Sequence, residues 1–180
     1  MTRALRQIRI PELDPIKEGK VRTIFKLPDG HLLITASDRI SAFDVVLPTA
    51  IPDKGKVLTQ ISNYWFNTLD SIPHHHLVHT DFQKFPDFLH PYREILEGRS
   101  VVVRNADVVP YECVVRGYIS GSLWKAYRRG EQPYGIQLPD DLQESSVFPE
   151  PIFTPTTKAD SGHDLPVTET EMANSIGWDL

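Results

Sequence analysis

The sequence has a single cysteine, Cys113, among 180 residues, so no disulfide bond can form within the chain. It has no apolar run of the roughly 18 residues that a membrane-spanning helix needs. Its N-terminus carries basic residues without an apolar core, unlike a secretory signal. It also has no basic excess, because 19 basic and 24 acidic residues leave a net charge of −5. We therefore expect a soluble, cytoplasmic protein whose partners include neither nucleic acid nor membrane.

Several familiar chemical motifs are also missing. The chain has no G-x-x-x-x-G-K-[ST] loop, and it has neither the H-R-D nor the D-F-G motif of protein kinases. The histidine-rich stretch "HHHLVH" (residues 74–79) suggests a metal at first sight. Three adjacent histidines cannot all point at one ion in regular structure, and no cysteine or acid lies nearby to complete a zinc site. We predict no metal site within this chain.

Hydrophobic periodicity predicts alternating strands and helices. "KVRTIFKL" (20–27) alternates Val21, Thr23, Phe25 and Leu27 with Arg22, Ile24 and Lys26. A Pro-Asp-Gly turn separates it from "HLLITAS" (31–37), which predicts an antiparallel hairpin. Residues 55–70 predict an amphipathic helix, 101–104 and 113–118 predict strands, and 121–130 predict a short helix closed by glycine. From residue 131 the chain is rich in proline and predicts loops, until a last helix capped by Thr168 or Thr170.

The stretch "PYECVVRGYISGSLWKAY" (110–127) places charges within a strand-like run. Glu112 and Arg116 share one face of a strand but lie roughly 13 Å apart at about 3.3 Å per residue, so each needs a separate partner. Either a polar ligand lies beside this face or the face is solvated. Cys113 points the other way and is predicted to be core. The turn at Gly121 and Ser122 opens a helix whose free N–H groups, with Arg116, can bind an anion; an ordinary capped helix is the alternative.

Four further segments are candidate ligand contacts, each with a surface turn or loop as its alternative. Gly19, Lys20 and Arg22 open the first hairpin and can contact a polyphosphate. A second group of polar residues lies where the second strand ends, and a pair of lysines flanks a glycine before the first helix. A fourth group lies in the loop "FTPTTKADSGHDLP". These residues are Asp38, Arg39, Ser41 and Asp44, then Lys54 and Lys56, then Thr156, Thr157, Lys158, Asp160, His163 and Asp164.

These segments occur in a specific order. "GKVR", "SDRISAFD", "KGKVLTQIS..WF", "VVVRNADVVPYECVVRGYISGSLWKAY" and "FTPTTKAD.GHD" together resemble the phosphoribosylaminoimidazole-succinocarboxamide synthase (SAICAR synthetase) family, from about residue 17 to residue 180. The resemblance implies a ligase of de novo purine biosynthesis that condenses CAIR, the carboxyaminoimidazole ribotide, with L-aspartate. It uses ATP and magnesium and yields SAICAR, ADP and phosphate.

The resemblance also implies an architecture and site roles. It implies an α+β fold, with a mostly antiparallel nucleotide-binding lobe (1–105) related to kinase and ATP-grasp folds and the beginning of a central ATP- and substrate-binding lobe (106–180). ATP contacts would be Gly19, Lys20, Arg22, Arg104, Asn105, Asp107 and Glu112, although Glu112 could face CAIR instead. Substrate contacts would be Asp38, Arg39, Ser41, Arg116, Gly121 and Ser122. Lys158 and Asp164 would be catalytic.

The chain departs from the family pattern in two places. Thr23 stands where the family usually has an acid, and no D-x-K-x-E-F-G segment, the source of the family's magnesium-binding acids, occurs. We therefore expect these residues to form the N-terminal part of such an enzyme, without a complete metal site. The alternatives are a nucleotide- or ribotide-binding module without turnover and a kinase-like phosphotransferase, which the missing kinase motifs disfavour.

Overall fold

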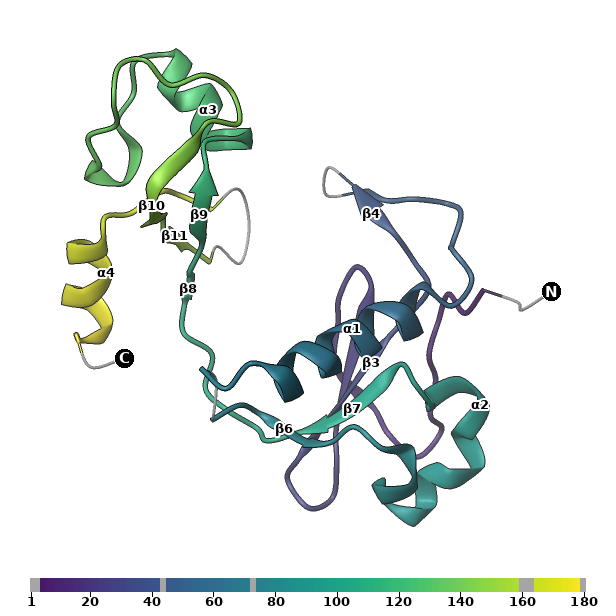
Figure 1. Ribbon diagram of the computed structural model, residues 1–180. Helices are drawn as coiled ribbons and strands as arrows, with labels where there is room; N and C mark the ends of the chain where they lie inside the picture. Colours follow the sequence, from purple (N-terminus) through teal and green to yellow (C-terminus); the bar gives the residue numbers. More distant parts are fainter. Residues whose placement is uncertain (1–3, 43–44, 72–73, 159–163, 179–180) are drawn as a thin grey trace. The chain divides into compact units, whose positions relative to one another are not determined.

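The computed structural model describes residues 4–42, 45–71, 74–158 and 164–178. The chain divides into two compact units, residues 1–106 and 107–180. Both units combine helices with antiparallel strands, so the predicted α+β class is confirmed (Figure 1). Among the described residues, no helix is long and apolar enough to cross a membrane.

The first unit is built on a five-stranded antiparallel sheet in the order β1-β2-β3-β7-β6. Its strands are β1 (Pro15–Glu18), β2 (Arg22–Lys26), β3 (Leu32–Ala36), β6 (Leu77–His79) and β7 (Ser100–Val103). The predicted hairpin is β2–β3, whose turn includes Gly30 at φ 87°. Strand β2 buries Thr23 and Phe25 and leaves Arg22 and Lys26 exposed, as its alternation predicts. A short pair, β4 (Ser41–Ala42) and β5 (Val45–Val46), extends beyond β3.

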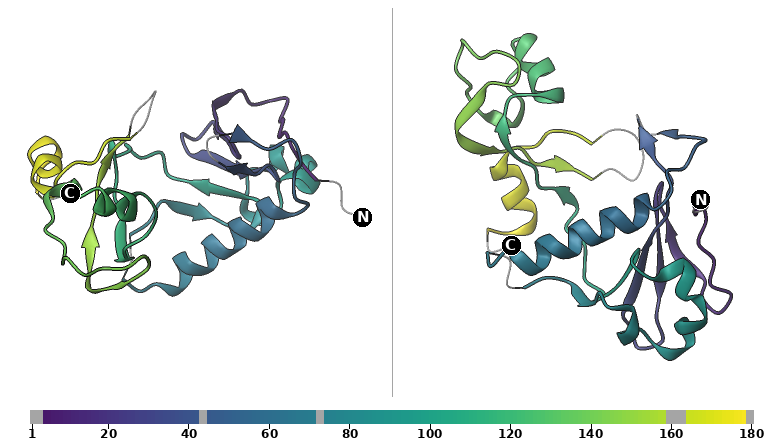
Figure 2. Two further views of the ribbon diagram at one scale, coloured as in Figure 1. Left: turned by 90° about the horizontal axis from the view of Figure 1, so that it is seen from above. Right: turned by 45° about the vertical axis from the view of Figure 1, so that its right-hand side comes forward.

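The core of the first unit lies on one face of this sheet. It joins Phe25, Leu33 and Val102 from the strands to side chains of the N-terminal segment and of three short helices, η1 (Phe82–Lys84), η2 (Asp87–Tyr92) and α2 (Arg93–Leu96). The other face carries α1 (Lys54–Thr68), so the sheet has a helix on each side (Figure 2, right). The core face is mainly apolar but also buries Thr23, Thr35 and Ser100. The face that carries α1 has Arg22 beside Ile34 and Val101.

Helix α1 matches the predicted helix in length but not in packing. Of its residues, all of which the structure describes, only Gly55 is buried. The apolar stripe that the periodicity places on one face is exposed, with Leu58, Ile61 and Trp65 at 46%, 50% and 52%. The helix touches the sheet at its first turn, because a Cβ at position 55 would lie 2.4 Å from the Ala36 carbonyl oxygen. Contact through a glycine, rather than through the apolar stripe, holds this helix.

The second unit contains two short antiparallel pairs and two helices. Strand β8 (Tyr111–Glu112) pairs with β11 (Thr156–Thr157), and β9 (Val115–Tyr118) pairs with β10 (Val147–Phe153). The helices are α3 (Gly121–Arg128) and α4 (Glu169–Ile176), with a short η3 (Pro133–Gly135) between them. A small core forms around Ile119, Leu123 and Phe148.

Two strand predictions in this unit need correction. The predicted strand 113–118 is interrupted, because regular pairing stops after Glu112 and resumes at Val115. Cys113 therefore does not alternate into a core and is exposed, so its prediction as a core residue was wrong. The proline-rich region was predicted as loops, yet β10 forms there: its register shifts between Val147 and Ile152, which accommodates prolines that cannot donate to a ladder. The last helix is capped by Thr168 in a reciprocal capping box with Glu171.

Candidate functional site

The turn between β1 and β2 presents the first predicted cations. Its backbone closes on itself, since the Gly19 amide donates to the Arg22 carbonyl oxygen at 2.7 Å. Lys20 is exposed in this turn, and Arg22 is exposed at the start of β2, on the face opposite the buried Thr23. Both cations thus lie at or beside a closed hairpin turn, and Arg22 is on the sheet face that carries α1.

A hollow of about 240 Å³ lies on that face, between the sheet and α1. Its floor is apolar and its rim is polar. Burial, and then the charges of His75 and Arg22, lower the pKa of His76 on the rim, so the ring favours its neutral form. An apolar floor with a few polar groups is typical of small-molecule sites. The hollow is lined by Arg22, Ile34, Ala36, Thr59, Ser62, Asn63, Phe66, His76, Leu77, Arg99 and Val101.

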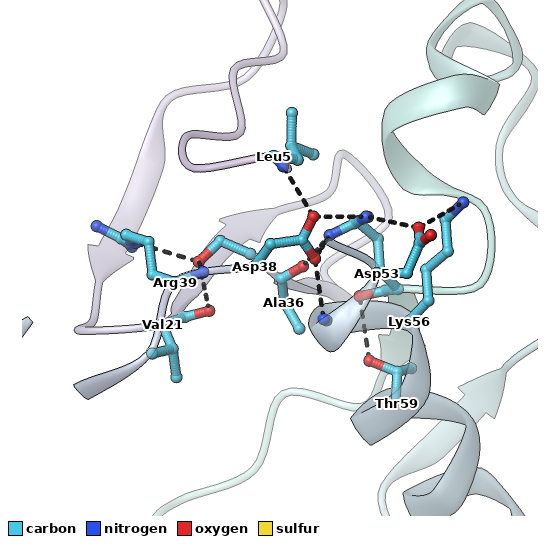
Figure 3. A network of polar contacts seen from close by, with 11 residues as sticks. Leu5, Val21, Ala36, Asp38, Arg39, Asp53, Lys56 and Thr59 are labelled. Atoms are coloured by element: carbon cyan, nitrogen blue, oxygen red, sulfur yellow. Dashed lines mark hydrogen bonds and ion pairs between the residues drawn. The ribbon is translucent and has the colours of Figure 1, made fainter. Parts of the chain in front are cut away.

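Asp38 lies at the centre of a buried polar network (Figure 3). Its carboxylate accepts hydrogen bonds from Arg99 Nη1 at 2.6 Å, from the Leu5 amide at 2.7 Å and from the Gly55 amide at 3.0 Å. Burial raises the pKa of Asp38, but these hydrogen bonds outweigh it and hold the pKa below 3.8. The carboxylate is fully buried and its acceptors are committed within the fold. This differs from the predicted cleft-lining position, because contact with substrate would break this network.

The two other predicted residues of this segment occupy different positions. Arg39 is half-buried and donates through Nε to Ser37 Oγ at 3.1 Å and through Nη2 to the Gly19 carbonyl oxygen at 3.0 Å. Ser41 is half-buried in β4, where it pairs with Val46. Asp44, which the sequence placed with them, lies outside the described residues. Within this segment, Asp38 is a buried anchor, Arg39 contacts the first hairpin turn and Ser41 belongs to a short strand.

The residues around the boundary between the units are exposed. Arg104 follows β7, and its amide donates to the His76 carbonyl oxygen at 2.8 Å. The side chains of Arg104, Asn105 and Asp107 all face solvent in the structure. The main-chain hydrogen bond to His76 holds Arg104 beside the start of β6. The contact of these three residues with the adenine remains a prediction.

In the second unit, Glu112 and Lys158 belong to one small ladder. Glu112 pairs with Thr156, and the Lys158 amide donates to the Pro110 carbonyl oxygen at 3.0 Å. Both side chains are exposed, and so is that of Asp164. Asp160 and His163 lie outside the described residues. The ladder brings predicted residues from two distant parts of the sequence side by side.

Arg116 is held by a partner that the sequence did not reveal. Its Nε donates to Thr154 Oγ1 at 3.0 Å, and that hydroxyl donates to the Val114 carbonyl oxygen at 3.0 Å. Thr154 is fully buried, so it fixes the direction of the half-buried arginine. Because Thr154 takes up only Nε, the Nη groups, the end of the guanidinium fork, are not used by this contact.

The turn after β9 opens α3 as predicted. Gly121 has φ 60°, a conformation that favours glycine, and both Gly121 and Ser122 are exposed. Ser120 is the N-cap residue, but its side chain makes no capping hydrogen bond. The first amides of α3 are therefore not satisfied by a capping side chain, which is the arrangement expected at a helix terminus that binds an anion.

Sequence reasoning missed three residues that organise these sites. Arg99, Ser37 and Thr154 are 4%, 1% and 0% exposed and hold Asp38, Arg39 and Arg116 respectively. Arg99 directly precedes β7, all of whose residues are buried. A single cation next to such a strand could have indicated a buried ion pair. For the metal, no group of three histidine, cysteine, aspartate or glutamate side chains within the described ranges could hold an ion.

Comparison with known proteins gives consistent matches. A family model described as SAICAR synthetase matches residues 15–179. The phosphoribosylaminoimidazole-succinocarboxamide synthase of Thermodesulfovibrio yellowstonii is 52% identical over 162 residues, which cover 90% of this chain and 55% of that protein. The structure of SAICAR synthase from Saccharomyces cerevisiae complexed with SAICAR has a TM-score of 0.87 and 38% identity, covering 98% of this chain and 60% of that one.

A structure of SAICAR synthetase in complex with ADP has a TM-score of 0.66 and 25% identity, with 91% of this chain and 59% of that chain covered. The chain therefore spans between half and two-thirds of the length of these relatives.

Proposed function

The chain belongs to the SAICAR synthetase family, and from that membership we propose that it acts in the ATP-dependent condensation of CAIR with L-aspartate. The products are SAICAR, ADP and phosphate, and the reaction belongs to cytoplasmic purine biosynthesis. The family match over residues 15–179 carries this proposal. The folded arrangement of cations in each unit supports it.

The reaction requires an activated carboxylate. A carboxylate is a poor electrophile, so the γ-phosphoryl group of ATP is transferred to the carboxylate oxygen of CAIR and ADP leaves. The amine of aspartate then attacks the acyl carbon, and phosphate leaves. Negative charge on the transferred group is offset by cations held in place before the reaction. The chain needs no covalent nucleophile for these steps, and the exposed Cys113 has no role in them.

Each unit supplies one phosphate-binding element in this proposal. In the first, Lys20 and Arg22 contact the phosphates of ATP from the β1–β2 turn, and the adjoining hollow receives part of the nucleotide. In the second, Arg116 and the first amides of α3 at Gly121 and Ser122 hold the phosphate of CAIR. The guanidinium is suited to this task, because Thr154 occupies Nε and leaves the Nη groups for a second acceptor.

Arg39 donates to the Gly19 carbonyl oxygen and is not assigned to the substrate. The other predicted contacts keep their roles with one exception. Arg104, Asn105 and Asp107 contact the adenine side of ATP, and Glu112 contacts its ribose or CAIR. Lys158 and Asp164 act near the reacting groups, and Ser41 lines the substrate site. The exception is Asp38, whose buried contacts assign it to holding the fold.

Magnesium is the usual partner of ATP in phosphoryl transfer, where it offsets phosphate charge. The described residues do not gather the acids that would hold it. We propose that its ligands lie outside this chain's described residues, and no step above depends on it.

Separate titrations of ATP and CAIR test the proposal. Arg22→Gln should weaken ATP binding by about tenfold and leave CAIR binding within about twofold of wild type, whereas Arg116→Gln should do the reverse. Arg9→Gln, at an exposed arginine of the N-terminal segment, is the matched control.

ADP release that requires both CAIR and aspartate would establish the ligase and contradict the predicted lack of a metal site. ATP binding unaffected by Arg22→Gln and CAIR binding unaffected by Arg116→Gln would refute the assignment.

A further inference from the structure

The backbone on both sides of Lys20 is held from a single neighbouring segment. The Gly19 carbonyl oxygen accepts from Arg39 Nη2 at 3.0 Å, and the Val21 carbonyl oxygen accepts from the Ser37 amide at 2.9 Å and from Ser37 Oγ at 3.0 Å. These three hydrogen bonds supplement the one that closes the turn. The turn is therefore attached to the end of β3 and does not depend on its own strands alone.

The two side chains that hold the turn form a relay. Arg39 Nε donates to Ser37 Oγ at 3.1 Å, and that hydroxyl donates onward to Val21. Ser37 is 1% exposed, so the relay lies in a low-dielectric environment where hydrogen bonds strengthen one another. The Arg39 guanidinium, although half-buried, is thus directed at the turn by two of its donors.

Asp38, which lies between Ser37 and Arg39 in the sequence, anchors the segment to the rest of the unit. Besides its carboxylate contacts, its amide donates to the Leu5 carbonyl oxygen at 2.7 Å, and its carbonyl oxygen accepts from the Ile51 amide at 2.9 Å. Its salt bridge to Arg99 is buried on both sides. Removing such a contact leaves an uncompensated buried charge, so the segment resists displacement. The backbone that carries Ser37 and Arg39 is accordingly rigid.

We propose that Arg39, acting with Ser37, is a positioning residue that fixes the direction of Lys20 for nucleotide phosphates, and that it is not a contact for the ribotide. In a trans peptide the C=O and the following N–H point in opposite directions. Holding the Gly19 carbonyl oxygen toward Arg39 therefore turns the Lys20 amide to the other side. This inference rests on the proposed role of Lys20 at the ATP phosphates and revises the predicted role of Arg39.

Titration of the full chain with ATP and with CAIR tests the role. Arg39→Gln removes the charge and one of the two contacts, and should raise the Kd for ATP by about tenfold while the Kd for CAIR stays within about twofold. Arg39→Lys, whose ammonium cannot serve both acceptors as a fork, should raise the Kd for ATP by about threefold. Arg9→Gln should change neither. A loss of CAIR binding with ATP binding intact would overturn the inference.

Amide exchange separates this inference from the proposed function. The Gly19 and Ser37 amides both donate within the clamped region. In Arg39→Gln their exchange should quicken by about tenfold relative to Arg9→Gln, while exchange in residues 100–103 stays unchanged. If the wild-type chain binds no ATP, the proposed function fails and this comparison alone decides whether Arg39 clamps the turn. Equal exchange in the two variants refutes the clamp whatever the titrations show.

Discussion

Replacing Asp38 by asparagine should be the most damaging single change in the first unit. The substitution keeps the shape of the side chain but removes its charge, which leaves the guanidinium of Arg99 buried without its counter-ion at 2.6 Å. It also turns one oxygen into an NH₂ group facing the amide of Leu5 or of Gly55, both of which donate to the carboxylate. Asp53 Oδ1, at 3.9 Å from Arg99 Nη2, is a more distant counter-ion and replaces little of the lost contact. Breaking a buried pair typically costs about 3–5 kcal/mol, a large share of a domain's total stability.

The assay must report on the first unit alone. Hydrogen exchange of the amides in β3 and β7, followed by mass spectrometry on peptides covering 32–36 and 100–103, measures the free energy of opening of the central sheet. Asp14→Asn is the control, since Asp14 is exposed and such a change usually stays within about 0.5 kcal/mol.

A double-mutant cycle sharpens the test. Arg99→Met removes the other partner, and the combined variant should lose about 1–3 kcal/mol less than the sum of the two single variants. Full recovery is not expected, because either the Leu5 or the Gly55 amide would still lack its acceptor. A free energy of opening for Asp38→Asn within about 1 kcal/mol of wild type would refute the reasoning.

Three further predictions follow from the same contacts. Gly55→Ala should destabilise the first unit by about 1–3 kcal/mol in the exchange assay, because the new Cβ would overlap the Ala36 carbonyl oxygen, and an unchanged value would contradict this. Burial, followed by neighbouring positive groups, lowers the pKa of His76 below 6.5, so the neutral form that stabilises the fold is lost as pH falls. Between about pH 7.5 and about pH 5.5, the urea midpoint should therefore drop by less in His76→Gln than in wild type. Equal drops in the two proteins would count against this prediction. Thr154→Val should weaken CAIR binding severalfold without affecting ATP, because Arg116 loses the acceptor that orients it, and equal CAIR titrations would exclude that role.

The sequence predicted local structure well where the signal was local. The β2–β3 hairpin, α1, α3 and a last helix capped by Thr168, one of the two threonines predicted, each depend on residues within a few positions of one another. Strand alternation around Phe25 also predicts correctly which side chains are buried. These features need no knowledge of distant partners.

Features set by distant partners were not predictable in this way. Asp38 and Arg99 are 61 positions apart, and Arg116 and Thr154 are 38 apart, so no spacing rule links them. A continuous strand would turn Cys113 toward a core, whereas the two partners β10 and β11 divide that strand. The sequence located the polar residues of the candidate sites, and the tertiary contacts separated those that hold the fold from those that remain exposed.

The Ser37–Asp38–Arg39 segment also determines which genetic changes can compensate for one another. Ser37 and Arg39 bind main-chain oxygens, which every amino acid carries, so no replacement at position 19 or 21 can compensate for a substitution at position 37 or 39. Asp38, by contrast, depends on another side chain, and a selection for restored growth should recover suppressors of its replacement at position 99. Substitutions at positions 37 and 39, whose partners are backbone atoms, should therefore be corrected by reversion. A substitution at position 38, whose partner is a side chain, should also be corrected by second-site changes.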